Sequence, residues 1–197
     1  MAPERPPGAT ILFDKDGTLI ENVPYNVDPA RIRLIRGGHE PIRRLAGAGF
    51  DAAIVTNQSG VARGYFTLED LDAVRDRVAA LLAELGMSLR GFYACPHLPT
   101  GSVPAYAIAC TCRKPGSGLV RQAIDELGLV AADTWLVGDS WADVLAGRGA
   151  GCRTALVGSE WRLGRFLPPG KEPEISVPSL AEAADAILAR VPSGVAG

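Results

Sequence analysis

Acidic side chains occur in two short segments that could bind a divalent cation. In "LFDKDGTL", Asp14 ends an apolar run and Asp16 follows two residues later; in "LVGDSWADV", Asp139 and Asp143 follow another apolar run. Converging carboxylates repel one another unless a hard cation lies among them, and oxygen-rich sites with open water positions suit Mg²⁺. The four residues together therefore predict a magnesium site.

Each acidic segment, taken alone, could have a purely structural role. An Asp-x-Asp-Gly is common in turns, and an aspartate after a strand can cap the next helix. A calcium loop would need further oxygen ligands and a glutamate at its twelfth position, and the Val and Pro that soon follow Asp16 do not fit it. The whole set, rather than either segment, indicates an active site.

Two further segments supply groups that bind an anion. In "VTNQSG", Thr56 and Asn57 follow an apolar run and offer a hydroxyl, an amide and backbone N–H groups. Lys114 offers a positive charge, although most lysines are solvated surface residues. An anion beside a carboxylate-bound cation is the arrangement expected for phosphoryl transfer chemistry.

Soft metal ligands gather in the segment from residue 95 to residue 112. Cys95-x-His97 and Cys110-x-Cys112 provide three thiolates and one imidazole, the set that closes a tetrahedral structural Zn²⁺ site. A Cys110–Cys112 disulfide and unligated thiols are the alternatives. Zinc would order a long loop and fix Arg113 and Lys114, whereas Cys152 is expected to pack as a small hydrophobic residue.

Short apolar runs alternate with helical patterns and must position these groups. The expected strands are 10–14, 51–56, 91–95, 134–139, 152–158 and a weaker 174–177. The expected helices are 39–48, 68–85, 118–127, 141–147 and 179–190, with Thr67 as the N-cap of the second and Gly86 as its stop. This order predicts an α/β fold of three layers, a Rossmann-like parallel sheet with helices on both faces, whose ligands lie at the carboxyl ends of the strands.

Composition limits the classes of partner. The 197 residues are 47% hydrophobic with a formal net charge of -2, which indicates one domain (10–191) with flexible tails (1–9 and 192–197). No broad cationic surface is available for nucleic acid, and no apolar run is long enough to span a bilayer. The start lacks the pattern of a secretory signal, so we expect a cytoplasmic protein, and a monomer.

Four segments in this order resemble the motifs of haloacid-dehalogenase (HAD) superfamily phosphohydrolases: "DKDGT", the Thr of "VTNQSG", the Lys of "CRKP" and "GDSWAD". The resemblance implies that Asp14 is the nucleophile and Asp16 the general acid and base. It implies that Thr56 and Lys114 bind the phosphoryl group. Mg²⁺ would be held by Asp14, the backbone carbonyl of Asp16 and Asp139, with support from Asp143.

The cysteine loop resembles one branch of that superfamily, the capless D-glycero-D-manno-heptose 1,7-bisphosphate 7-phosphatases and the related histidinol-phosphate phosphatases. A phosphorylated sugar is then the expected substrate, and Arg113 would meet the phosphate that is not cleaved. Without a cap domain, the loops around the site must select the substrate. The expected substrate-binding residues are Asn22, Val23, Pro24, Tyr25, Asn57, Gln58, Ser59, Arg63, Arg113 and Ser140.

Two positions depart from the pattern of the heptose enzymes. Lys15 stands where an arginine is common, and Ser140 stands where a lysine is frequent. Histidinol phosphate, another sugar phosphate or a nucleotide therefore remain alternative substrates, and a histidinol enzyme would favour acidic loop residues such as Glu21 or Asp28. A phospho-accepting switch that resembles a receiver domain is the non-enzymatic alternative, but it would not need the zinc loop or Asp16.

Overall fold

A single parallel sheet organises the chain, and the computed structural model describes residues 10–158 and 168–191. The strand order is β3-β2-β1-β4-β5-β6, and every pair is parallel. The strands are β1 (Thr10–Phe13), β2 (Asp51–Asn57), β3 (Leu89–Cys95), β4 (Trp135–Gly138), β5 (Arg153–Val157) and β6 (Ile175–Val177). The predicted tails, residues 1–9 and 192–197, lie outside the described residues.

Alternate side chains of the strands enter two separate apolar layers. In β1, Ile11 and Phe13 contribute to one layer and Leu12 to the other, and β2 divides in the same way between Ile54 and Val55. Successive side chains of a strand point to opposite faces, so a run that is apolar throughout must be covered on both sides. This explains why the central strands read as continuous hydrophobic segments.

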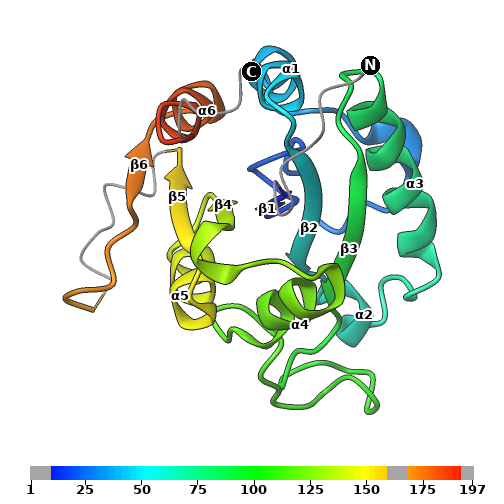
Figure 1. Cartoon of the computed structure of the whole chain (residues 1–197). Helices are drawn as coiled ribbons and strands as arrows, with labels where there is room; N and C mark the ends of the chain where they lie inside the picture. Colours follow the sequence, from blue (N-terminus) through cyan, green and yellow to red (C-terminus); the bar gives the residue numbers. More distant parts are fainter. Residues whose placement is uncertain (1–9, 159–167, 192–197) are drawn as a thin grey trace.

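Helices cover both faces of the sheet (Figure 1). Buried side chains of α1 (His39–Gly47), α3 (Asp70–Ala83) and α6 (Leu180–Leu188) pack on one face, and those of α4 (Gly118–Leu127) and α5 (Trp141–Ala150) pack on the other. The remaining elements are α2 (Gly60–Arg63) and the 3-10 helices η1 (Pro29–Arg31) and η2 (Ala131–Asp133). The predicted three-layer α/β fold is therefore confirmed.

Element boundaries differ from the sequence prediction by a few residues. The long helix begins at Asp70 rather than Leu68, so Glu69 and not Thr67 is its N-cap residue. Thr67 and Asp70 still exchange the two hydrogen bonds of a capping box, one turn before the regular helix. It ends at Ala83, and Gly86 follows with a φ of 80°. Helix α2 was not predicted, because four residues are too few to show helical periodicity.

The chain changes direction between its two central strands. From β1 it runs outward through β2 to β3, and then returns to β4 on the other side of β1. Such a switch point leaves a crevice at the carboxyl ends of the strands, where open α/β sheets bind ligands. Asp14 follows β1 and Asp139 follows β4, so the fold brings the two acidic segments to this crevice.

The segments that could carry a cap domain are short. Residues 14–38 contain only η1 and two isolated bridges, and residues 96–117 contain no helix or strand. The described part of the chain therefore has no cap over the crevice, as predicted. Within the described residues, none of the helices combines the length and apolar character that a bilayer span requires.

Candidate active site and metal sites

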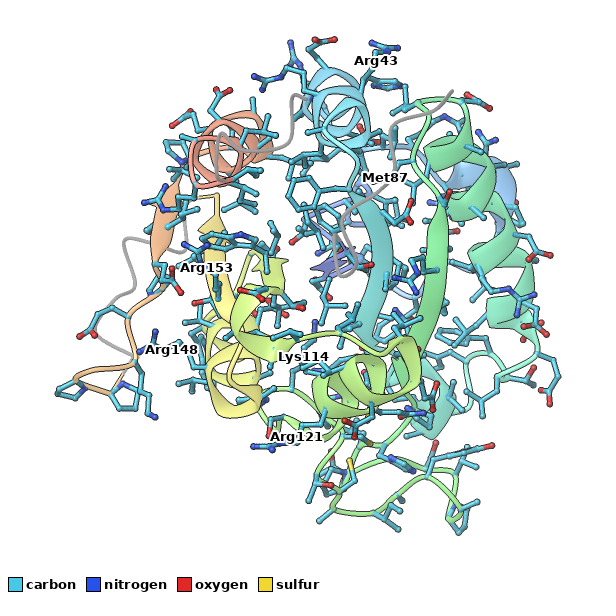
Figure 2. The ribbon with its side chains drawn as sticks, viewed as in Figure 1. Arg43, Met87, Lys114, Arg121, Arg148 and Arg153 are labelled. Atoms are coloured by element: carbon cyan, nitrogen blue, oxygen red, sulfur yellow. The ribbon has the colours of Figure 1, made fainter. Side chains whose placement is uncertain are left out.

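Lys114 lies at the centre of the candidate active site, with its side chain only 3% exposed. Its Nζ atom is 2.6 Å from Asp14 Oδ1 and 2.5 Å from Asp143 Oδ1, and it donates to the Val55 carbonyl at 2.7 Å. Figure 2 shows this lysine near the middle of the molecule. Segments 100 residues apart in sequence thus form one buried ionic centre.

Burial and charge oppose each other in this centre. Burial raises the pKa of Asp14 to about 7, and Asp143 and Asp139 add to the rise while Lys114 opposes it. Burial alone lowers the pKa of Lys114, but the carboxylates of Asp143 and Asp14 outweigh it and raise that pKa. The site therefore holds the lysine charged and makes ionisation of Asp14 costly without further positive charge.

The carboxylates fit a hard divalent cation. Asp14, Asp139 and Asp143 each place an oxygen within 4.8 Å of the others. Two oxygens bound at about 2.1 Å to an octahedral ion are at most about 4.2 Å apart, so a small inward movement of these side chains would complete the binding of such an ion. Lys114 forms ion pairs with two of these carboxylates, those of Asp14 and Asp143. Gly17 allows this packing, because a Cβ there would lie 2.3 Å from Asp139 Oδ2.

Asp16 lies beside the carboxylate group and has its own partners. Lys15 donates to Asp16 Oδ1 at 2.7 Å, and Gln58 Nε2 donates to Asp16 Oδ2 at 3.1 Å. The same Gln58 nitrogen donates to Thr56 Oγ1 at 2.9 Å. Gln58, predicted to bind substrate, thus links the candidate acid to the candidate phosphate-binding hydroxyl.

Ser140 also makes an internal contact. Its hydroxyl donates to Asp143 Oδ2 at 2.6 Å, and its backbone N–H donates to the same oxygen at 3.1 Å. These bonds start helix α5 and fix the Asp143 carboxylate, whose other oxygen faces Lys114. The substrate contact predicted for Ser140 stays a prediction, and holding Asp143 is a role that the sequence did not indicate.

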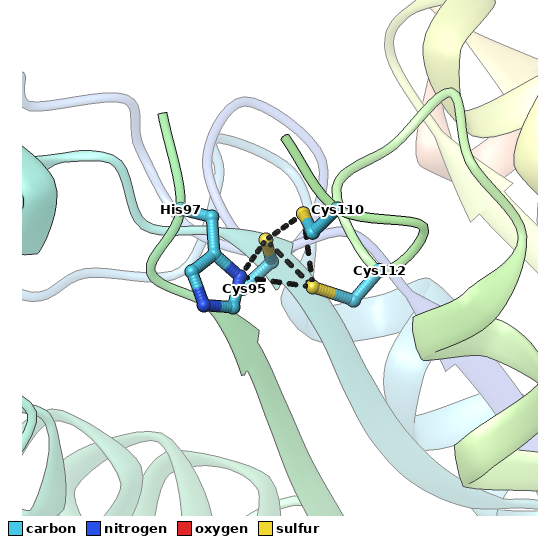
Figure 3. A group of neighbouring side chains, drawn as sticks. All are labelled: Cys95, His97, Cys110 and Cys112. Atoms are coloured by element: carbon cyan, nitrogen blue, oxygen red, sulfur yellow. Dashed lines mark hydrogen bonds between the residues drawn. The ribbon is translucent and has the colours of Figure 1, made fainter. Parts of the chain in front are cut away.

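The cysteine loop brings four soft ligands together (Figure 3). Cys95 ends β3, and the other three side chains converge on it from the following loop. The Cys112 sulfur is 3.1 Å from that of Cys95 and 3.2 Å from both Cys110 Sγ and His97 Nδ1, and Cys95 Sγ and Cys110 Sγ are 3.7 Å apart. Sulfurs bound at about 2.3 Å to a tetrahedral zinc ion are about 3.8 Å apart. The observed separations equal or fall short of this value, so a slight opening of the cluster would admit zinc, and three thiols with one imidazole are a donor set that zinc prefers.

The pKa values of the cysteine thiols are shifted in different directions by their surroundings. Burial raises the pKa of Cys95 and of Cys112. Burial also acts to raise the pKa of Cys110, but hydrogen bonds to its sulfur from Cys112 and from the Arg113 N–H outweigh burial and lower it. A metal must displace the remaining protons, so its binding is expected to strengthen as pH rises.

The same loop caps helix α2. The last carbonyls of a helix lack partners within it; here Val103 N–H donates to Ala62 O and Ser102 Oγ donates to Arg63 O, both at 2.9 Å. Gly101 permits this approach, because a Cβ would lie 2.5 Å from Ala62 O. The loop therefore supports the helix that follows Thr56 in the chain.

One predicted substrate-recognition segment, residues 22–25, meets the residues after helix α2 at an aromatic pair. The rings of Tyr25 and Tyr65 pack edge to face with centroids 4.8 Å apart, and both side chains are largely exposed. Tyr25 adopts a φ of 55°, which is unusual for a residue with a side chain. Tyr65 was not predicted as a site residue, since one aromatic residue after a short helix carries no signal.

The remaining predicted substrate-binding residues come from several segments. Asn22 and Pro24 are exposed and Val23 is half-buried. Ser59 is the N-cap of α2 and Arg63 is its last residue. Arg113 donates from Nη1 to the His97 carbonyl at 3.2 Å, which ties its guanidinium to the cysteine loop.

Comparison with known proteins identifies relatives along most of the chain. The HAD-hydrolase-like family profile matches residues 111–183. A D-glycero-beta-D-manno-heptose-1,7-bisphosphate 7-phosphatase of Yersinia pestis is 37% identical over 147 residues, 75% of this chain and 78% of that protein. The protein of the same name from Pseudomonas aeruginosa is 36% identical over 182 residues, 90% of this chain and 97% of that protein.

A solved structure agrees in fold and in sequence. The crystal structure of a D,D-heptose 1,7-bisphosphate phosphatase from B. bronchiseptica, complexed with magnesium and phosphate, is 31% identical, with a TM-score of 0.75 over 92% of this chain and 99% of that one. Fold, motif order and identity therefore agree, and the chain belongs to the HAD-like family of hydrolases, together with the heptose-1,7-bisphosphate 7-phosphatases that it resembles along most of its length.

Proposed function

We propose that this chain is a Mg²⁺-dependent phosphatase that removes the 7-phosphate of D-glycero-D-manno-heptose 1,7-bisphosphate. The observation that carries the proposal is the buried contact of Lys114 with Asp14 and Asp143 beside Asp139. The residues proposed as nucleophile, phosphate-binding cation and metal ligands all lie at the switch point of the sheet, which supports these roles. The relatives' names supply the substrate.

In the first step, a carboxylate oxygen of Asp14 attacks the phosphorus atom and the bond to the sugar oxygen breaks. Asp16 gives its proton to that departing oxygen, so that the sugar leaves as an alcohol rather than an alkoxide. The Lys114 ammonium and the Thr56 hydroxyl bind the oxygens of the phosphoryl group while it is transferred. The product of this step is a phosphoryl group covalently attached to Asp14.

In the second step, Asp16 takes a proton from a water molecule as that water attacks the phosphorus atom. The bond to Asp14 breaks, inorganic phosphate leaves, and both carboxyl groups return to their starting states. Gln58 supports this alternation, because its amide holds Asp16 beside Thr56 through both steps. When bound, Mg²⁺ neutralises the carboxylates and polarises the phosphoryl oxygens.

The magnesium ligands proposed are the carboxylates of Asp14, Asp139 and Asp143, together with the backbone carbonyl of Asp16. The proposed zinc ligands are Cys95, His97, Cys110 and Cys112. This second site lacks a place for an activated water, since its four ligands already complete a tetrahedron. Its proposed role is to order the loop that carries Arg113 and caps helix α2.

Replacing Cys110 by serine tests the zinc proposal. We expect zinc content to fall from about one ion per chain to well below one, because a neutral hydroxyl is a poor zinc ligand. Amide exchange should rise at Val103 and in α2, whose contact depends on the ordered loop. The measurements are elemental analysis and hydrogen exchange.

The matched control for this experiment is Cys152→Ala. Cys152 is buried away from the metal group, and burial raises its pKa to about 12, so it is expected to remain a thiol. Its removal should leave zinc content unchanged. Equal zinc in the Cys110→Ser variant and the wild type would contradict the assignment of the cluster.

Replacing Arg113 by alanine tests the contact with the second phosphate. A planar guanidinium binds a phosphate through two hydrogen bonds, and Arg113 directly precedes Lys114, the proposed ligand of the phosphate that is cleaved. We expect KM for heptose 1,7-bisphosphate to rise about 10–100-fold, as for the loss of a charge-assisted contact. KM for heptose 7-phosphate should change much less.

Arg43→Ala is the control for that substitution, because Arg43 lies on α1 with an exposed side chain. Steady-state phosphate release with both substrates gives the two KM values. An equal rise for the bisphosphate and the monophosphate would show that Arg113 does not contact the second phosphate.

A phosphate-release screen tests the proposed function as a whole. With Mg²⁺ present, we expect kcat/KM to be highest for heptose 1,7-bisphosphate, compared with histidinol phosphate, fructose 1,6-bisphosphate and nucleotides. Asp28, an acidic residue that could have met an amine, instead accepts a hydrogen bond from the Ala30 N–H in its own loop. A preference for histidinol phosphate would replace the heptose proposal and leave the phosphatase chemistry intact.

A further inference from the structure

The side chain of Asn57 binds the backbone of Lys114 at both of its polar groups. Asn57 Oδ1 accepts from the Lys114 N–H at 3.0 Å, and Asn57 Nδ2 donates to the Lys114 carbonyl at 3.0 Å. The two residues are 57 positions apart in the chain. A pair of opposed hydrogen bonds to one residue fixes the orientation of its backbone as well as its position.

The end of β2 holds the lysine at a third point. The Val55 carbonyl accepts from Lys114 Nζ at 2.7 Å, so backbone and side chain of Lys114 are both tied to the same strand end. Both polar groups of the Asn57 side chain are thereby engaged inside the protein. A direct contact with substrate, predicted for Asn57 from sequence, would have to compete with these bonds.

We propose that Asn57 is a positioning residue, which places Lys114 so that its Nζ reaches the phosphoryl oxygens. The expected effect on the reaction rate rests on the proposed phosphatase function. The contact between Asn57 and Lys114 does not depend on that function. Cys112 lies two residues before Lys114, so the proposed zinc site and Asn57 would both restrain the backbone of this lysine. A small displacement of such a group can cost about 10²-fold in rate.

Kinetics of Asn57→Ala give the first test. We expect kcat for phosphate release to fall about 10–100-fold, and KM to stay within about threefold, because the substrate loses no direct partner. The control is Asn26→Ala; within residues 10–158 and 168–191, the Asn26 side chain forms its hydrogen bonds with Asp28 of its own exposed loop. A rise in KM with kcat retained would instead make Asn57 a substrate contact and overturn the proposal.

Amide exchange gives a second test that does not depend on activity. The chain contains three lysines, Lys15, Lys114 and Lys171, so ¹⁵N-lysine labelling yields three lysine amide signals that single substitutions can assign. In Asn57→Ala, exchange of the Lys114 amide should accelerate about tenfold or more, since its acceptor is removed. The Lys171 amide, which donates to Pro168 on a distant exposed segment, is the internal control.

The two tests separate the two proposals. Unchanged exchange at Lys114 in Asn57→Ala would overturn the positioning role, whatever the enzyme hydrolyses. A second outcome is accelerated exchange at Lys114 in Asn57→Ala while the wild-type protein releases no phosphate from any monoester. This outcome would support the contact between Asn57 and Lys114 and contradict the phosphatase function. Accelerated exchange with an unchanged kcat would show that the contact is structural only, and would also overturn the proposal.

Discussion

Replacing Asp14 by asparagine is expected to lower kcat for phosphate release by about 10⁴-fold or more. The amide has nearly the shape of the carboxylate, but it cannot form the bond to phosphorus on which both chemical steps depend. Losses of this size are typical when a nucleophile is removed and the rest of the site remains. Steady-state and single-turnover phosphate release with Mg²⁺ measure the effect.

The same substitution should not destabilise the metal-free protein. Burial raises the pKa of Asp14 to about 7, against an ordinary value of 3.8, so the folded state binds a proton more tightly than the unfolded state. The ionised carboxylate therefore costs stability that is absent below pH 3.8 and grows until about pH 7. Asparagine carries no such cost, so in EDTA its Tm at pH 7 should equal or exceed that of the wild type.

Magnesium should make the wild type more stable than the Asp14→Asn variant. The wild type gains from an ion that binds only the folded state, whereas the variant has lost one ligand. The control is Asp125→Asn, which changes an exposed carboxylate on α4. Turnover within tenfold of wild type in Asp14→Asn would refute the nucleophile, and a lower Tm in EDTA would refute the account of its burial.

Replacing Lys114 by methionine is expected to affect both rate and stability. The rate should fall about 10³-fold, because the phosphoryl oxygens lose a preorganised charge in a buried site. The fold should lose about 3–5 kcal/mol, the usual cost of removing one partner of a buried ion pair, because Asp14 and Asp143 would remain without their shared cation. Calorimetry and phosphate release measure the two effects.

The size of the stability loss should depend on magnesium. A divalent ion among the same carboxylates replaces part of the missing charge, so Mg²⁺ should raise the Tm of Lys114→Met more than that of the wild type. Lys171→Met is the matched control, since Lys171 is exposed. A variant with a Tm within a few degrees of wild type in EDTA would show that the buried charges are balanced in another way.

Much of the fold could be predicted because its signals are local. The central strands are short runs without polar residues, and buried parallel strands require such runs, since both faces are covered. Asp14 and Asp139 could be placed at one edge of the sheet because the carboxyl ends of parallel strands lie together. Small errors concern helix ends and the four-residue helix α2, where the periodic signal is too brief.

Tertiary structure decided what each polar side chain touches. The type and order of Asp14, Thr56, Lys114 and Asp139, and the Cys and His spacing, were sufficient to indicate the chemistry from sequence. Nothing in the sequence shows that Asn57 holds the backbone of Lys114, that Gln58 joins Asp16 to Thr56, or that the loop after β3 caps α2. These contacts join segments far apart in the chain, and hydrogen bonds depend on distances of a few tenths of an ångström that only the packed sheet and helices define.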